Sequence, residues 1–274
     1  MALPSYATPV QRTYYYAYLF FCGVVFFFLI APLIAIIPIS FSVSPFMVFT
    51  DEMLTWPPDP DAWSLRWYKN MIGNCSADVV SSTVPCSNKW MIGTVNSFFI
   101  GFVATFIATT LGTLAALGLS RPHMPYKGLI MAILISPMIV PLIITAAGMF
   151  FFYARINLVY SFTGIILAHV ALATPFVVIT VTATLVGFDM NMVKASQSLG
   201  ARPVRTFFKV IMPLILPGVI SGALFAFITS FDEVVIVMFM ASLDQLTIPK
   251  QMWAGIRQEI SPVILCMATC LVIL

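Results

Sequence analysis

Charged side chains are scarce in this sequence of 274 residues. Asp, Glu, Lys and Arg together make up 8% of it, whereas apolar residues make up 61%. A soluble domain keeps about a quarter of its residues charged, so the composition excludes an ordinary soluble protein. It predicts an all-α integral membrane protein with room for about six transmembrane helices of ~20 residues each.

Motifs for nucleotide binding and catalysis are also absent. The chain has no G-x-x-x-x-G-K-[ST], no G-x-S-x-G and no H-E-x-x-H pattern. Its two histidines and five cysteines do not stand at metal-ligand spacing. The sequence therefore predicts no catalytic residue, no metal site and no enzyme activity. The net charge of +3 is small and gives no sign of a nucleic-acid partner.

Apolar segments divide the chain into candidate spans. The third of them contains Pro137 and Pro141, which predict a bent helix whose neighbours satisfy the freed carbonyls. The last is too short to cross a bilayer, so we expect the natural chain to continue beyond Leu274. The six segments are 14–37, 91–119, 128–152, 162–186, 213–240 and 262–274.

Small residues recur every four positions in the second segment. Ala104, Ala108, Gly112 and Ala116 would lie on one face of a helix. Small side chains let helix backbones approach closely in lipid. We expect this face to contact protein and not lipid.

His169 is a lone histidine in the fourth segment. An ionisable residue inside a membrane is a functional-site candidate, which makes His169 a candidate for the substrate pathway. No second group stands near it at metal or catalytic spacing. A hydrogen bond between helices is therefore the favoured interpretation.

Two adjacent acids, Asp232 and Glu233, stand near the far end of the fifth segment. Nineteen residues separate Pro213 from Asp232, which is about 28 Å of helix and reaches the outer boundary of the hydrocarbon. Carboxylates there are costly unless hydrated or paired. They either line a pathway for a cationic solute or hold helix geometry through protein donors.

A polar interruption at 187–212 separates the fourth and fifth segments. Asp189 can cap a helix, Gly200 can end it in a left-handed conformation, and Pro203 suits the first turn of the next helix. The sequence thus predicts a helical hairpin. Three cations fall near one face of the second helix at spacings of three and four, namely Arg202, Arg205 and Lys209.

This interruption resembles the cytoplasmic EAA loop of permease subunits of ABC importers. The family pattern is Glu-Ala-Ala, three residues, Gly, nine residues, then Ile-x-Leu-Pro. Gly200 and Pro213 match it, Ser196 replaces the second Ala, and Lys194 replaces the Glu and reverses its charge. The resemblance implies an ATPase-coupling loop made by Asp189, Lys194, Ala195, Ser196, Gly200, Ala201, Arg202, Arg205 and Pro213.

The resemblance also implies an architecture and partners. Residues 1–274 would form a single permease domain with the type I ABC importer fold. A second permease subunit, two cytoplasmic ATP-binding subunits and an extracytoplasmic substrate-binding protein would complete the complex. ATP and Mg would bind to the ATPase subunits, and this chain would bind no cofactor. The helix at 189–200 would dock in a groove on the ATPase, whose closure would move the spans as rigid bodies.

Two short runs resemble the spermidine/putrescine branch of these importers. They are 63–68, Trp-Ser-Leu-Arg-Trp-Tyr, and 231–235, Phe-Asp-Glu-Val-Val. A carboxylate pair near the outer mouth would also favour a polycation. Importers of other amines, amino acids or opines remain alternatives within the same class.

Two further classes compete with the importer. A secondary transporter driven by an ion gradient should show intramembrane ion ligands and often an internal repeat, and the sequence has no repeat. An intramembrane enzyme would need a converging nucleophile or metal set, which His169 alone does not make.

The distribution of basic residues predicts the orientation. Residues 1–13, 119–128 and 187–212 hold seven Lys or Arg and one acid, whereas the opposite, longer loops hold six and nine. The positive-inside rule places the first set, with the N-terminus, in the cytoplasm. We therefore expect a multi-pass protein of the bacterial inner membrane, with the loop at 40–90 outside.

Cys75 and Cys86 share that extracytoplasmic loop. In an oxidising compartment they could form a disulfide. A reactive thiol or metal pair is the alternative, although no histidine or carboxylate cluster accompanies them.

Overall fold

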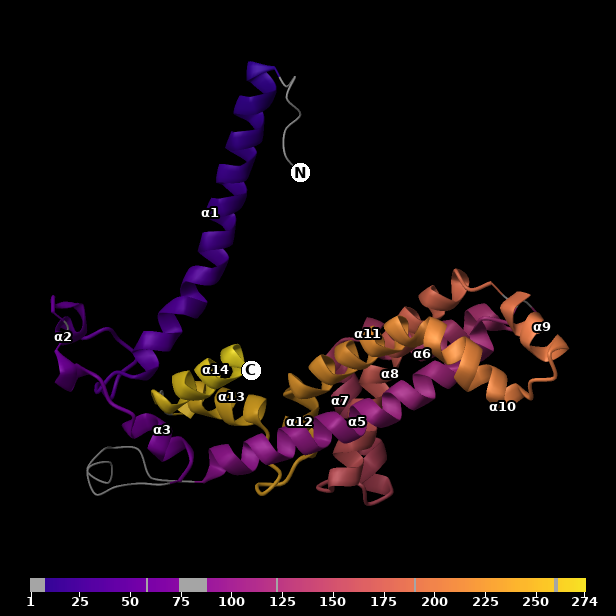
Figure 1. The fold of residues 1–274 in the computed structure, drawn as a ribbon. Coiled ribbons are helices and arrows are strands. Elements are labelled where there is room, and N and C mark those ends of the chain that lie inside the picture. The colour runs from indigo at the N-terminus through magenta and orange to yellow at the C-terminus, as the bar shows by residue number, and fades with distance from the viewer. Residues whose placement is uncertain (1–7, 58, 74–87, 122, 190, 259–260) are drawn as a thin grey trace. The chain divides into compact units, whose positions relative to one another are not determined.

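The computed structural model describes residues 8–57, 59–73, 88–121, 123–189, 191–258 and 261–274. The described chain is helical, and its one β pairing is an isolated bridge between Ser42 and Trp63. It divides into two compact units (Figure 1). The first unit is Met1–Lys89 with Ala254–Leu274, and the second is Trp90–Trp253.

The predicted apolar segments are all helical. Among the residues that the structure describes, four stretches are long and apolar enough to cross a membrane, and a fifth is so if the bent pair α6 and α7 counts as one span. The short apolar helix α14 (Val263–Ile273) brings the number of apolar segments to six. The four long stretches are α1 (Pro9–Ser40), α5 (Lys89–Leu119), α8 (Phe162–Val186) and 203–231, which comprises α10 (Pro203–Thr206), η2 (Phe207–Ile211) and α11 (Met212–Phe231).

The third span is broken where the sequence predicts a bend. Its halves, α6 (Lys127–Ile139) and α7 (Leu142–Arg155), meet at 103°. Pro141 lacks an N–H and disfavours the helical conformation of the residue before it. Val140 is accordingly extended, with φ −72° and ψ 135°.

The fifth span ends earlier than predicted. The sequence predicts one helix through Met240, but α11 stops at Phe231 and α12 (Val235–Met240) begins after a break. At the break, the backbone N–H of Asp232 closes the last turn of α11, and a carboxylate oxygen of Glu233 accepts a hydrogen bond from the Ile236 N–H at 2.9 Å. The carboxylate satisfies one of the free donors of a new helix instead of continuing the old one.

Close packing of α8 against α11 forms the centre of the second unit. Gly218 faces Thr184, and Gly222 faces Thr180 and Val177 so closely that a Cβ at either glycine would overlap them. The two threonine hydroxyls donate to carbonyls of their own helix. They therefore face α11 without an unsatisfied donor.

The stripe of small residues in α5 is also buried. Ala104, Ala108, Gly112 and Ala116 are all inside the second unit. A Cβ on Gly112 would overlap Val177 of α8. This confirms the prediction that the stripe contacts protein.

A set of hydrogen bonds joins the end of α1 to α3 (Arg66–Met71) in the first unit. The Trp67 indole N–H donates to the Ser42 carbonyl at 2.9 Å, and the Tyr68 hydroxyl lies 2.7 Å from the Ser40 hydroxyl. Burial raises the pKa of the Tyr68 hydroxyl, so it stays protonated. These four residues form what we call the clasp.

The clasp also reaches α14. The Cys266 thiol donates to the Ser40 carbonyl at 3.4 Å, and Arg66 stacks over the Trp67 ring at 4.3 Å. Trp67 is fully buried. The run at 63–68 that resembles polyamine permeases thus supplies packing between helices. The remaining short helices are α2 (Asp51–Leu54), η1 (Pro60–Ala62), α9 (Asn191–Ser198) and α13 (Ile248–Gln258).

Substitution of one glycine tests the packing of α8 against α11. Gly218→Ala should destabilise the protein by about 1–3 kcal/mol because the added methyl overlaps Thr184. Gly148→Ala in α7 is the matched control, since its Cβ meets nothing within 4 Å. That control should be neutral or stabilising by up to ~1 kcal/mol. Thermal unfolding of the purified complex measures both, and equal effects would contradict the packing.

Removal of the indole N–H tests the clasp. Trp67→Phe leaves the Ser42 carbonyl without its donor and should cost about 1–3 kcal/mol. Trp56→Phe is the control, because Trp56 is 93% exposed. The unfolding midpoint should fall for Trp67→Phe alone. A midpoint unchanged from that of the control would show that the bond contributes nothing.

Candidate functional site

The polar hairpin has the shape that the sequence predicts. The Asp189 carboxylate accepts from the Asn191 N–H at 2.9 Å, at the start of α9 (Asn191–Ser198). Gly200 has φ +78°, the left-handed conformation. The N–H groups of Gly200 and Ala201 bond to the carbonyls of Gln197 and Ser196 at 2.9 and 3.1 Å. This pair of bonds is the Schellman motif that ends a helix.

A hydrogen bond fixes the two arms of the hairpin to each other. Ser196 Oγ of α9 lies 3.0 Å from Thr206 Oγ1 of α10, and Thr206 is buried. Ser196 stands where the family pattern has its second Ala. The sequence does not predict this bond, because helical periodicity does not show which residues meet across a turn.

The start of α11 contains a widened turn. Pro213 cannot donate a backbone hydrogen bond, and the segment before it, η2, is a π-helix. A π turn accommodates a residue that the regular α ladder cannot. Pro213 therefore marks the end of the hairpin and the start of the long helix.

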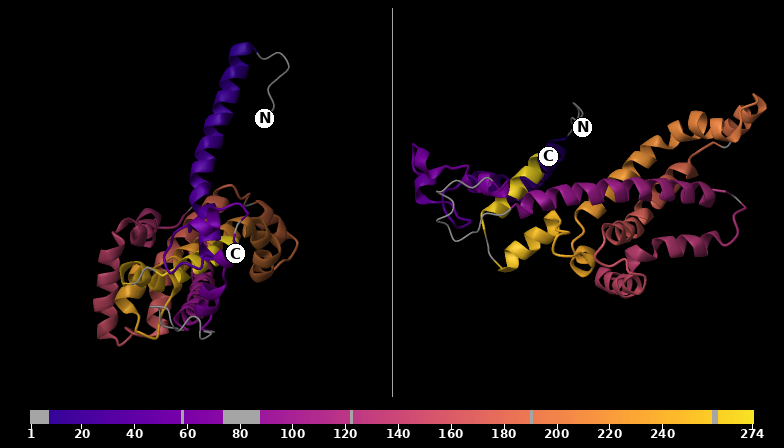
Figure 2. Two further views of the ribbon diagram at one scale, coloured as in Figure 1. Left: turned by 90° about the vertical axis from the view of Figure 1, so that its left-hand side faces the viewer. Right: turned by 90° about the horizontal axis from the view of Figure 1, so that it is seen from below.

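The hairpin lies at one end of the second unit and leads into α11, and α12 follows the far end of α11 (Figures 1 and 2). Its surface is apolar and cationic. Leu199 and Val204 are 88% and 69% exposed. Four cations are exposed, and none forms an ion pair with another residue of the described ranges. They are Lys194, Arg202, Arg205 and Lys209.

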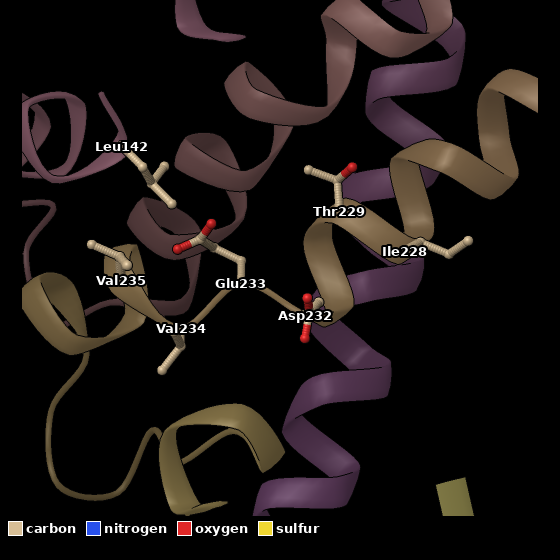
Figure 3. A pocket seen from close by; sticks show the side chains of 7 residues that line it. All are labelled: Leu142, Ile228, Thr229, Asp232, Glu233, Val234 and Val235. Carbon is tan, nitrogen blue, oxygen red and sulfur yellow. The ribbon is translucent and has the colours of Figure 1, made fainter. Parts of the chain in front are cut away.

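A pocket of about 330 Å³ lies at the end of α11, where the chain breaks before α12 (Figure 3). Its walls come from α7, α11 and the connection to α12. The pocket is mainly apolar with two carboxylates. It is lined by Leu142, Ile228, Thr229, Asp232, Glu233, Val234 and Val235.

Glu233 is occupied by the protein. Its side chain is only 7% exposed and caps α12 through the Ile236 N–H. At the other end of α12, the Lys250 ammonium donates to the carbonyls of Ala241 and Ser242 at 3.3 Å. Burial lowers the pKa of Lys250. The Glu233 carboxylate at the N-terminus of α12 and the Lys250 ammonium at its C-terminus both complement the dipole of this helix.

Asp232 is free. Its side chain is exposed and has no hydrogen-bond partner among the residues that the structure describes. Figure 3 shows its carboxylate pointing away from that of Glu233. The sequence treats the two acids as an equivalent pair, whereas the structure separates them into one capping group and one open carboxylate.

His169 bonds to a neighbouring helix. Its Nδ1 atom lies 2.8 Å from Ser230 Oγ of α11, and both residues are buried. The hydrogen bond between helices that the sequence favours is therefore present. His169 itself does not line the pocket.

Two further predictions concern cysteines and metals. Cys75 and Cys86 lie outside the described residues, so their disulfide stays a prediction. Within the residues that are described, no three His, Cys, Asp or Glu side chains gather as metal ligands would.

Helices that are long and apolar enough to cross a membrane, a capped hairpin and a pocket with an open carboxylate are the features expected of a membrane permease. The family comparison agrees. Residues 108–274 match the model of the binding-protein-dependent transport system inner membrane component. The chain belongs to this family, so it is a permease subunit of an ABC importer.

Curated relatives are similar over most of their length. The spermidine/putrescine transport system permease protein PotC of Haemophilus influenzae is 28% identical over 254 residues, 93% of this chain and 90% of the relative. The putrescine transport system permease protein PotI of Escherichia coli K12 is 28% identical over 252 residues, 89% of this chain and 81% of the relative.

A solved structure has the same fold. It is a bacterial ABC transporter involved in the import of the acidic polysaccharide alginate, with a TM-score of 0.71. The match covers 92% of this chain and 82% of that one at 15% sequence identity. This similarity supports the predicted ABC importer permease fold and says nothing about substrate.

Substitution of Gly200 tests the coupling role predicted for the hairpin. A Cβ there meets nothing within 4 Å, so only the left-handed backbone conformation opposes a side chain. Gly200→Val should therefore strain the hairpin by about 1–2 kcal/mol and reduce the solute transported per ATP hydrolysed. Gly200→Asn, which tolerates this conformation, should transport nearly as well as the wild type. If the Val variant is equally well coupled, the shape of the hairpin is not required.

Proposed function

We propose that the chain forms part of the import pathway for a polyamine such as spermidine or putrescine. The observation that supports this most directly is the open Asp232 carboxylate in a mainly apolar pocket, whose second carboxylate, Glu233, is engaged in capping α12. A polyamine carries ammonium groups separated by methylene chains. A carboxylate can bind one ammonium group, while Ile228, Val234 and Val235 contact the methylenes.

The relatives support the same substrate class, because both PotC and PotI are named for polyamine transport. An acidic polysaccharide, the cargo of the structural neighbour, would be repelled by a free carboxylate at this place. The polyamine is therefore the better fit to the chemistry of the pocket. Other amines, amino acids and opines are the alternatives that the experiment below separates.

The proposed orientation places the hairpin in the cytoplasm and the pocket on the outer side of a bacterial inner membrane. The 20 residues of α11 join the two sites, and at ~1.5 Å per residue they span about 30 Å. This is the thickness of the hydrocarbon core. With the basic residues concentrated on the hairpin, the N-terminus is cytoplasmic.

The proposed complex contains a second permease, two ATP-binding subunits and an extracytoplasmic binding protein. ATP and Mg bind to the ATPase subunits. The apolar and cationic surface of the hairpin docks on an ATPase, and closure of the ATPase pair moves α8 and α11. Since Lys194 is exposed and unpaired, the ATPase groove has to accept a cation where the family pattern has Glu.

Uptake into proteoliposomes tests the proposal. The complex encoded with this chain is reconstituted with its binding protein, and radiolabelled spermidine and putrescine are supplied with or without ATP inside. Saturable, ATP-dependent uptake is expected. Uptake driven by an ion gradient without ATP would contradict the importer class. ATP hydrolysis stimulated by the binding protein without polyamine uptake would contradict the substrate and leave the other amines, amino acids and opines.

The two acids provide a matched pair of variants. Asp232→Asn should raise the KM for polyamine uptake about threefold or more, because it removes an exposed charge partner. Glu233→Gln keeps an acceptor for the Ile236 N–H and should leave KM nearly unchanged. Equal KM values for both variants and the wild type would show that Asp232 does not contact the substrate.

A further inference from the structure

His169 is a polar side chain deep in the second unit, with 1% of its surface exposed. A buried polar group destabilises the protein unless it is hydrogen-bonded. Its Nδ1 atom has Ser230 as partner, whereas its Nε2 atom is buried and has none among the described residues. The described part of the chain thus offers no second group to which a proton from this imidazole could pass.

The bond occupies a defined position in the contact between α8 and α11. The helices are antiparallel, and Val177 faces Gly222. Eight residues further along each helix, in opposite directions, His169 faces Ser230. Gly222 also faces Thr180, and four residues further along each helix, toward the hairpin, Gly218 faces Thr184. The contact between the two helices therefore runs from the hairpin to the pocket, and the imidazole lies at its outer end.

The glycine contacts stop short of the pocket. Gly222 is the last glycine of α11, and Ser230 stands one residue before the helix ends at Phe231. Helix ends fray unless something holds them. Asp232 follows directly, and its N–H bonds to the Ile228 carbonyl in the last turn of α11. The orientation of Asp232 therefore depends on that turn keeping its place.

We propose that His169 is a positioning residue that holds the outer end of α11 through Ser230, and with it the Asp232 side chain at the pocket. Neither the substrate nor a transported proton contacts the imidazole. When the hairpin is moved, the glycine contacts and this bond make the ends of α8 and α11 near the pocket move together. Only the statement about what Asp232 binds rests on the proposed function.

A pair of substitutions separates this role from mere packing. The amide of Asn can take the place of Nδ1 of histidine, whereas the amide of Gln takes the place of Nε2. His169→Asn can therefore keep the bond to Ser230, and His169→Gln cannot. Ser230→Ala removes the bond from the other side and should behave like His169→Gln.

The measurement is the reactivity of a cysteine at the pocket. Thr229→Cys is introduced into the reconstituted complex, and labelling of its peptide by a membrane-impermeant maleimide is followed by mass spectrometry. Thr229 lines the pocket in the last turn of α11 and is half-buried. Leu243→Cys is the control position, because Leu243 is 90% exposed after α12.

We expect His169→Gln and Ser230→Ala to raise the labelling rate at position 229 about fivefold, the size expected from loss of one buried hydrogen bond. His169→Asn should stay within about twofold of the parent. The rate at position 243 should not change. Equal labelling of the Asn and Gln variants, in complexes assembled to the same extent, would overturn the proposal.

Uptake by the same variants distinguishes this proposal from the proposed substrate. If the parent complex transports no polyamine but His169→Gln is labelled faster than His169→Asn, the positioning role is supported and polyamine as the substrate is contradicted. If the parent complex transports polyamine but the two variants are labelled at the same rate, polyamine as the substrate is supported and the positioning role is contradicted. If both succeed, His169→Gln should raise the KM for uptake and His169→Asn should not.

Discussion

The close approach of α8 and α11 is the contact on which the second unit depends. It exists because Gly218 and Gly222 leave no side chain where Thr184, Thr180 and Val177 lie. In a membrane, two apolar helices gain little free energy when they exchange contacts with lipid for contacts with each other. Dispersion contacts at short range therefore have to hold them together. The hairpin connects the same two helices at one end, and the pocket forms where α11 stops at the other.

The pocket shows how a short break in a helix creates a polar site. The chain leaves α11 at Asp232 and uses the Glu233 carboxylate to start α12, and the Lys250 ammonium donates to the two carbonyls that directly follow α12. Each charged group at the ends of α12 thus compensates backbone groups that the break leaves open. Asp232 is the carboxylate that this compensation does not use, which makes it available to a cation.

Much of the arrangement could be predicted from the sequence. The spacing of Asp189, Gly200 and Pro203 determines the hairpin because cap residues act locally. The stripe from Ala104 to Ala116 predicts a buried face because its period is that of a helix. Roles that depend on distant partners could not be predicted. The different positions of Asp232 and Glu233 and the bond between Ser196 and Thr206 require knowledge of which residues meet in space.

The clasp affects how cargo can be inferred from shared motifs. Trp67 is fully enclosed by its own protein, and Tyr68 is tied to the end of α1. A side chain enclosed in this way has no surface left to contact a transported solute, so Trp67 cannot discriminate between solutes. The resemblance of the run at 63–68 to polyamine permeases therefore rests, at Trp67 and Tyr68, on residues that brace helices, and proteins with the same bracing can differ in cargo.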